Sequence, residues 1–123
     1  KLKGAVVELG AGWVPGMLRR LDDVCRIFAR NDESVRFDRK PSEQLSEQMG
    51  FTPMPNEDLG QMIIESNPDL YLFSSDYPHI EGTKDPIGRF ERTLEGAEED
   101  TKSKFYSENF LRLWPEARVE ARA

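Results

Sequence analysis

Apolar residues along this chain follow two patterns: short continuous runs, and longer stretches in which they recur every three or four positions. Short runs are typical of buried strands, whereas the helical spacing is typical of helices that pack by one face. The runs predict strands at 4–10, 49–54 and 70–75. The spaced stretches predict helices at 16–30, at 57–66, from 86 onward and at 101–114.

The ends of these helices are marked by residues that suit such positions. Pro15 stands at the start of the first helix, where its missing N–H does no harm. Asn56 is expected to cap the second helix and Asp85 the third, and Pro115 is expected to end the last. The helix faces expected to be buried contain Met17, Leu21, Val24, Cys25, Phe28, Leu59, Met62, Ile63, Ile87, Phe90, Leu94, Ala97, Tyr106, Phe110 and Leu113.

The expected order is strand, helix, strand, helix, strand, helix, helix, which is typical of an α/β fold. A polar excursion at 31–48, with one short helix in PSEQLSEQ, separates the first helix from the second strand. Such alternation implies parallel strands joined by right-handed crossovers and covered by helices. In these folds functional side chains gather at the carboxyl ends of the strands. The stretch LYLFSSDYPH places Asp76 and the only histidine, His79, at such an end.

Composition narrows the classes of function. With 123 residues the chain suits one domain, predicted at 1–114, followed by a charged, flexible tail at 115–123. The net charge of −6 and the lack of a Lys/Arg cluster argue against nucleic-acid binding. No apolar run has the length of a membrane span, and a single cysteine, Cys25, excludes an intramolecular disulfide. We therefore expect a soluble, cytoplasmic protein with a buried, inert thiol.

Asp76 and His79 are the first candidates for chemistry. An ionised carboxylate next to an apolar run needs a cation or hydrogen-bond donors. Asp76 is therefore either a metal ligand or proton-transfer group, or a loop aspartate that accepts backbone N–H bonds in an Asx turn. His79, three residues on, reaches the same cleft rim, although a lone histidine is more often a structural hydrogen-bonder than a catalytic group.

Glu8 and Trp13 are the second pair of candidates. An acid inside the first apolar run is unexpected, and Glu8 is either a proton acceptor, a substrate contact or the partner of a buried arginine. Trp13 follows shortly after, and either forms the apolar wall of a substrate pocket or covers the core.

Three stretches carry a resemblance to a known family: VELGAGWVPGMLRRLDD at 7–23, LYLFSSDYPHIEG at 70–82 and KFYSENFLRLW at 104–114. Together they resemble the amidohydrolase-related metal-dependent hydrolases of the TIM-barrel fold, the group that includes aminocarboxymuconate-semialdehyde decarboxylase-like enzymes. In that family the last barrel strand ends in a Ser-Asp or Thr-Asp pair whose aspartate binds the catalytic metal. The resemblance therefore implies that Asp76 is a metal ligand and that Asn109 is the recurrent asparagine of the closing helix.

The resemblance also implies a cofactor and a larger fold. The cofactor is one divalent metal, zinc or manganese, which activates water or polarises a carboxylated substrate. The family's other ligands are histidines on earlier strands, and here Glu8 stands in the region where the family often has a catalytic histidine. A complete barrel has eight strands in roughly 250 residues. Three expected strands thus predict the C-terminal part of a (β/α)8 barrel, inactive as an isolated chain.

Two functions follow from this interpretation. In the first, the chain is part of a metal-dependent hydrolase or decarboxylase that acts on a small molecule, and it contributes Asp76 to the metal centre of that enzyme. The second is a non-catalytic module, derived from the barrel, that associates with itself or with a partner. Open sheet edges favour pairing in either case, with a second copy or with the N-terminal part of a barrel. The substrate, and the choice between hydrolysis and decarboxylation, are left open by the sequence.

Overall fold

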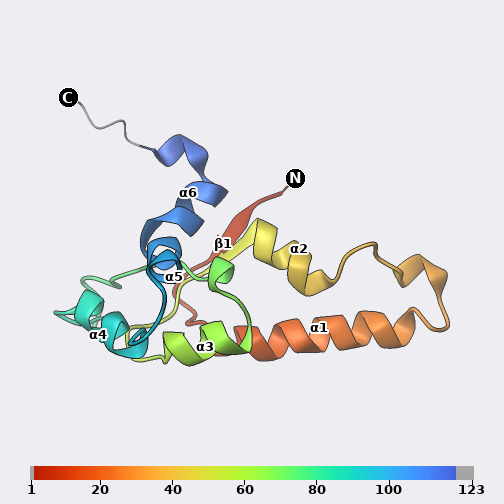
Figure 1. Ribbon diagram of the computed structural model, residues 1–123, viewed down its shortest axis with the longest axis horizontal. Helices are drawn as coiled ribbons and strands as arrows, with labels where there is room; N and C mark the ends of the chain where they lie inside the picture. Colours follow the sequence, from red (N-terminus) through yellow and green to blue (C-terminus); the bar gives the residue numbers. More distant parts are fainter. Residues whose placement is uncertain (1, 119–123) are drawn as a thin grey trace.

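The structure is a computed structural model that describes residues 2–118. It is an α/β arrangement in which helices pack against two short strands (Figure 1). The elements are β1 (Gly4–Val6), α1 (Val14–Phe28), α2 (Pro41–Gln48), β2 (Met49–Phe51), α3 (Leu59–Glu65), α4 (Pro86–Thr93), α5 (Glu99–Ser103) and α6 (Asn109–Leu113). Short 3-10 turns lie at Glu33–Val35, Pro68–Leu70 and Pro115–Ala117, and a π-helical turn lies at Lys104–Glu108. Within residues 2–118, no helix combines the length and the apolar character needed to cross a membrane.

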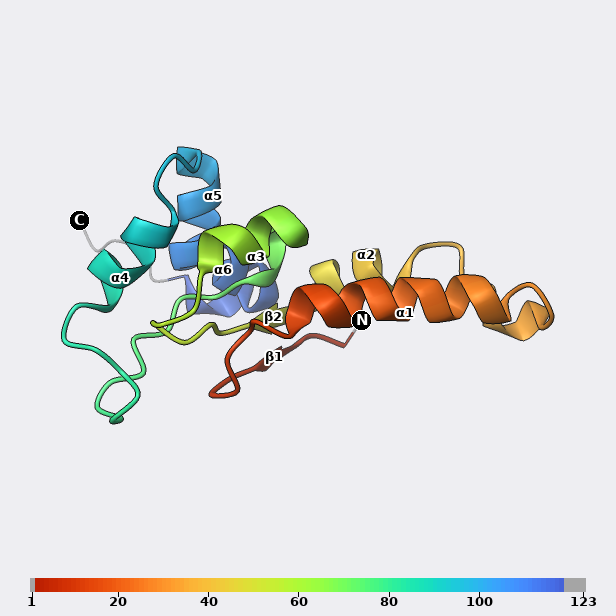
Figure 2. The ribbon, with the colours of Figure 1, turned by 90° about the horizontal axis from the view of Figure 1, so that it is seen from below.

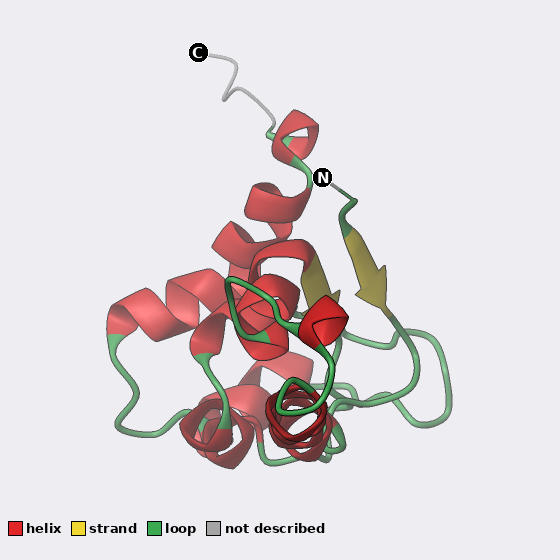
Figure 3. Ribbon diagram, turned by 90° about the vertical axis from the view of Figure 1, so that its right-hand side faces the viewer, coloured by secondary structure: helices red, strands yellow, loops and turns green. Residues whose placement is uncertain are grey.

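The two strands are parallel, as the alternating order predicts, and Figure 3 shows them running in the same direction. Their register pairs Gly4 with Met49 and Val6 with Phe51. The predicted third strand at 70–75 is wrong, because only Tyr71 forms a bridge, to Phe51. The N–H groups that follow bond to different elements. Leu72 N still donates to Phe51 O of β2 at 2.9 Å, but Phe73 N donates to Phe105 O in a helical segment at 3.0 Å.

Both paired strands are shorter than predicted. β1 stops at Val6 and β2 at Phe51, although the apolar runs continue beyond them. Past β1 the backbone turns at Glu8, whose φ of 61° lies in the left-handed region. The turn leaves Val7 and Leu9 exposed (58% and 69%), so the expectation that the whole run 4–10 is buried is wrong.

The core lies between the sheet and helices α3, α4, α5 and α6. Phe51, Tyr71, Phe90 and Phe105 are among its largest fully buried side chains. Phe90 and Phe105 meet edge to face with their ring centroids 4.9 Å apart, a favourable geometry for aromatic pairs. Aliphatic side chains fill the space around the rings; those of the same core cluster are Ala11, Val14, Leu18, Leu59, Met62, Leu70 and Leu94.

The C-terminal helix runs from Glu99 to Leu113 with the π-helical turn in its middle. A π-turn adds one residue to the helical repeat and so rotates everything after it. Phe105, Asn109 and Leu113, four residues apart, are buried against the core. The prediction holds for Leu113 and in part for Tyr106, which packs against the core from its edge. It is wrong for Phe110, which is 46% exposed and lies against Trp114.

Helix α1 and helix α2 form an arm that extends beyond the other helices (Figures 1 and 2). The helix predicted at 16–30 and the short helix in 41–48 are both confirmed. Only the first half of α1 is buried, at Val14 and Leu18. Phe28, at its far end, is 60% exposed, so its predicted burial is wrong. Cys25 is half-buried rather than buried.

The helix caps agree with the sequence in one case and differ in another. Asp85 caps α4, accepting a hydrogen bond from Gly88 N at 2.9 Å, as predicted. Asp58, not Asn56, caps α3 through Gln61 N. Ile87, expected on the buried face of α4, is 57% exposed. Of the predicted tail at 115–123, the first three residues form a 3-10 turn, and 119–123 lie outside the described residues.

Candidate functional site

Two carboxylates and the histidine come together where the chain leaves β1 and the 70–73 segment. Glu8 and Asp76 are the non-glycine residues with positive φ in the described chain, at 61° and 55°. This left-handed conformation costs an ordinary residue about 1 to 2 kcal/mol, so the surrounding contacts must hold it. Near these two residues Glu8, Asp76 and His79, which span 71 positions of the sequence, lie close together in space.

His79 lies between the two carboxylates. Its Nδ1 is 3.1 Å from Asp76 Oδ1 and 3.4 Å from Glu8 Oε1. One ligand atom from each of the three side chains falls within 4.8 Å of the other two. Asp76 has a side chain only 8% exposed, whereas Glu8 and His79 are more than half exposed. The cluster is therefore closed on the Asp76 side and open to solvent on the other.

The contacts of Asp76 bear on the two interpretations of this residue. His79 N donates to the backbone oxygen of Asp76 at 2.9 Å, so the turn is held by main-chain atoms and not by the carboxylate. Asp76 Oδ1 faces His79, and Asp76 Oδ2 is buried without a hydrogen-bond partner among residues 2–118. The geometry thus gives the carboxylate no Asx-turn bond and leaves one oxygen free for a ligand.

Glu57 holds the loop that carries Glu8. Its carboxylate accepts from Ala11 N at 2.9 Å, Gly12 N at 2.7 Å and Met54 N at 2.7 Å. Two features disfavour a side chain at position 10. A Cβ at Gly10 would lie only 3.0 Å from Glu57 Oε1, and the φ of 63° is one that residues with a side chain rarely adopt. The loops after β1 and β2 are thereby joined through one side chain. Sequence reasoning missed Glu57, since no pattern distinguishes it from the other acids.

Trp13 packs on the core and not on the cluster. Its ring meets Phe51 edge to face with centroids 5.5 Å apart, and its Nε1 donates to Gly10 O at 3.2 Å. It does not line the pocket next to His79. Of the two interpretations of Trp13, the geometry favours the cover of the core, with the indole still 43% exposed.

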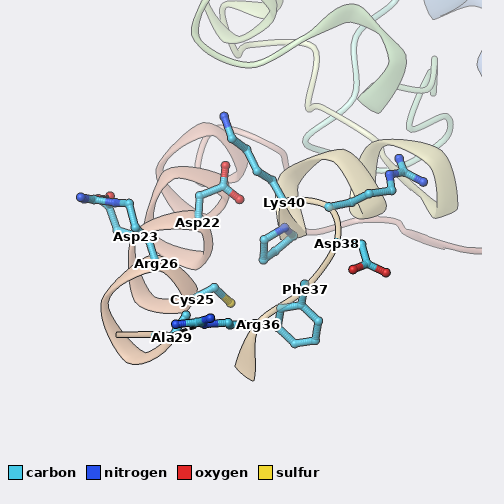
Figure 4. A pocket seen from close by; sticks show the side chains of 11 residues that line it. Asp22, Asp23, Cys25, Arg26, Ala29, Arg36, Phe37, Asp38 and Lys40 are labelled. Atoms are coloured by element: carbon cyan, nitrogen blue, oxygen red, sulfur yellow. Dashed lines mark hydrogen bonds and ion pairs between the residues drawn. The ribbon is translucent and has the colours of Figure 1, made fainter. Parts of the chain in front are cut away.

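Two pockets of similar size lie in different parts of the molecule. One, of about 550 Å³, adjoins His79 and is formed by the loop that leads to α4. The other, of about 560 Å³, lies between α1 and the segment 36–41 (Figure 4). There Cys25 and the ring of Phe37 stand among side chains of both charges, from Asp22, Asp23, Arg26, Arg36, Asp38, Arg39 and Lys40. None of the cluster residues lines that second pocket.

Comparison with solved structures finds a likeness, and comparison with known sequences does not. No known family's sequence profile matches this chain, and no curated protein matches it. Among solved structures, a crystal structure of an amidohydrolase from Mycobacterium avium subsp. paratuberculosis K-10 is similar, with a TM-score of 0.71 and 30% sequence identity. The likeness covers 91% of this chain and 28% of that one. It supports the amidohydrolase superfamily for this chain, which spans little more than a quarter of its neighbour's length.

Proposed function

We propose that this chain is part of a TIM-barrel amidohydrolase and supplies Asp76 as a ligand to its divalent metal. The observation that carries the proposal is the buried, unpartnered Oδ2 of Asp76 beside His79 and Glu8. A buried carboxylate oxygen without a donor is costly, and a bound cation removes that cost. The likeness of the chain to an amidohydrolase also supports the proposal.

The donor set fits the metal that the fold class uses. Carboxylate oxygens and an imidazole nitrogen are ligands of zinc, and the three side chains already lie within reach of one ion. When bound, such an ion acts as a Lewis acid and lowers the pKa of coordinated water. Asp76 is the anchoring ligand, because its position is fixed by burial. Glu8, which is exposed, is placed to accept a proton at the open side of the cluster.

The reaction we propose is hydrolysis or non-oxidative decarboxylation of a small molecule, in the group that includes aminocarboxymuconate-semialdehyde decarboxylase-like enzymes. The assignment to this group rests on the stretch around Asp76 and on Asn109. In the structure Asn109 is buried, and its Nδ2 donates to Pro68 O at 2.8 Å and Tyr71 O at 3.0 Å. The closing helix is thus tied to the segment that leads to the cluster.

Metal titration of the chain tests the assignment of Asp76. We expect saturable Zn²⁺ binding by isothermal titration calorimetry, and a loss of at least tenfold in affinity in Asp76→Asn, which keeps the shape and removes the charge. His79→Ala should weaken binding less, because Asp76, the anchoring ligand, remains. Asp23→Asn is the matched control, since Asp23 is an exposed acid on α1 paired with Arg26. Equal Zn²⁺ affinity in wild type and Asp76→Asn would refute the proposal.

A second candidate function, a self-associating or partner-binding module, is favoured by the sheet. Among residues 2–118, β1 pairs with β2 alone, so its other edge is open. Exposed apolar side chains accompany that edge at Leu2, Val7 and Leu9. Unpaired strand edges of this kind recruit further strands. Sedimentation velocity over a hundredfold concentration range separates the two candidates, because association without Zn²⁺ uptake supports only the module.

A further inference from the structure

Two serines, one in α2 and one in the segment that joins α1 to α2, form nearly the same hydrogen bond to a carboxylate. Ser42 Oγ donates to Asp22 Oδ2 at 2.6 Å, and Ser34 Oγ donates to Asp32 Oδ1 at 2.6 Å. The bond of Ser34 is local, because Asp32 lies two residues before it. The bond of Ser42 joins two helices, since Asp22 belongs to α1 and Ser42 to the first turn of α2. A change at the Ser42 hydroxyl therefore acts on how the arm is closed.

The residues that precede Ser42 distinguish it from the other hydroxyl side chains. Arg39 and Lys40 stand three and two positions before Ser42, and no other serine or threonine of the sequence has basic residues at both of these positions. Ser34 instead follows an asparagine and two acids at 31–33. Many protein kinases select their serines by such charges, which an acidic substrate groove attracts. Ser42 thus has the charge pattern of a kinase substrate, and Ser34 does not.

The segment that leads to Ser42 has the backbone form that suits a kinase groove. Arg36 and Lys40 have extended φ and ψ angles, and residues 36–40 form neither helix nor strand. The side chain of Lys40 is exposed and makes no ion pair or hydrogen bond in the part of the chain that the structure describes. Helix α2 has no buried residue, so its first turn opens at little cost. The half-buried hydroxyl of Ser42 is therefore within reach of an enzyme.

A phosphate on Ser42 would stand against a carboxylate. Asp22 accepts from Ser42 N at 2.9 Å with one oxygen and from Ser42 Oγ with the other. Glu43, the next residue, adds a further negative charge. The arginines that line the adjacent pocket (Figure 4) already pair with acids; these are Arg26, Arg36 and Arg39. Because a phosphoserine carries a charge of about −1.5 to −2 at neutral pH, repulsion from Asp22 outweighs any new pairing.

We propose that Ser42 is a phosphorylation site and that Asp22 makes it a switch for the arm. A kinase transfers the γ-phosphoryl group of ATP to Ser42 Oγ. The new bond joins Oγ to phosphorus, the bond from phosphorus to the β-phosphate oxygen breaks, ADP leaves, and the hydroxyl proton passes to the kinase's catalytic base. The phosphate removes the hydroxyl donor and repels Asp22, so the start of α2 separates from α1. The proposal is independent of the metal, because Asp76 and His79 lie outside the arm.

The test treats the chain with MgATP and the catalytic subunit of cyclic-AMP-dependent protein kinase, which prefers basic residues before its serine. Mass spectrometry should find one phosphate, on Ser42, in the wild type and in the matched control Ser34→Ala. Ser42→Ala should take up none, and Lys40→Gln, which removes an exposed unpaired charge, should slow the transfer at least about fivefold. Absence of phosphate at Ser42, or equal rates for the wild type and Lys40→Gln, would overturn the site.

Hydrogen exchange then tests the switch. Phosphorylation should make the amides of α2 exchange at least about tenfold faster and leave those of α3 and α4 unchanged. Asp22→Asn should reverse the effect, because its amide N–H donates to the phosphate, so α2 should exchange more slowly in phosphorylated Asp22→Asn than in the phosphorylated wild type. Unchanged exchange in the phosphorylated wild type, or no slowing in Asp22→Asn, would refute the switch even where Ser42 accepts phosphate.

Discussion

The body of the molecule and the arm made of α1 and α2 use the same residue types in different ways. In the body, Phe90 and Phe105 are 0% and 1% exposed and meet within an aromatic cluster. At the end of α1 and in the segment that joins it to α2, Phe28 and Phe37 are exposed by 60% and 57%, and neither belongs to the core cluster. The stability of this chain is therefore concentrated in the body, which also carries the loops of the candidate site.

The arm joins the core through the first half of α1, at Val14 and Leu18, and its far part is held by polar contacts. Asp22 on α1 accepts from Ser42 N at 2.9 Å and from Ser42 Oγ at 2.6 Å, and so caps α2 from a neighbouring helix. Arg39 pairs with Glu47 at 2.7 Å within the same region. Contacts of this kind contribute little each, because water competes for both partners. The comparison predicts that truncations of equal size have unequal effects in the two regions.

The largest effect is expected from Phe105→Ala. It removes a buried ring from contact with Phe90, Phe73 and Tyr106, and we expect a loss of about 3 to 5 kcal/mol in the free energy of unfolding. The matched truncation in the arm, Phe28→Ala, should change it by less than about 0.5 kcal/mol. Urea unfolding followed by circular dichroism measures both, and similar losses in the two variants would contradict the comparison.

An intermediate effect is expected from Tyr71→Phe, at the polar end of the same core. Tyr71 Oη lies 2.8 Å from Ser66 Oγ, and its loss should cost about 1 kcal/mol at neutral pH. Burial raises the pKa of Tyr71 to about 12. Because the folded pKa lies above the unfolded value of about 10, this contribution is complete below pH 10 and is lost as the pH rises through 12.

The measurement is the difference in stability between wild type and Tyr71→Phe across this alkaline range. The difference should narrow between pH 10 and pH 12, since only the wild type must keep a buried phenol protonated. A difference that stays constant over the range would show that the hydroxyl of Tyr71 is not held in the buried environment described.

The smallest effect is expected from Asp22→Ala in the arm. It removes the cap on α2, and we expect a loss of about 0.5 to 1 kcal/mol. The loss should be local: the amides of α2 should exchange faster with solvent, and those of α3 and α4 should not. Asp23→Ala is the control, because Asp23 pairs with Arg26 on the same helix and does not contact α2. Faster exchange throughout the body would mean that the arm is not an independent region.

The sequence predicts the elements that depend on local signals. The helix of α1, the helix in PSEQLSEQ and the Asp85 cap follow from apolar spacing, Pro41 and a capping carboxylate. The run at 70–75 looks like a strand by composition, but a strand needs a neighbour along its whole length. Phe73 N donates instead to the helical carbonyl of Phe105, so the parallel pairing with β2 ends after the single Phe51–Tyr71 bridge.

The exposure of Phe110 could not be predicted for a related reason. Helical spacing fits two neighbouring stripes equally well, one through Tyr106 and Phe110 and one through Phe105 and Asn109, and the core takes the second. In the site, Asp76 and His79 were evident from their place after an apolar run, and the structure brings Glu8 to them as well. Glu57 carried no signal, because its role depends on loops that meet only in the folded chain.

Glu57 has a consequence for the entropy of binding. Its three backbone hydrogen bonds fix the loop that carries Glu8 and join it to the segment after β2. The conformational freedom of that loop is therefore lost when the chain folds, before any ligand arrives. A ligand that meets Glu8 encounters a group already in place, and the entropic penalty of ordering the loop does not reduce its affinity.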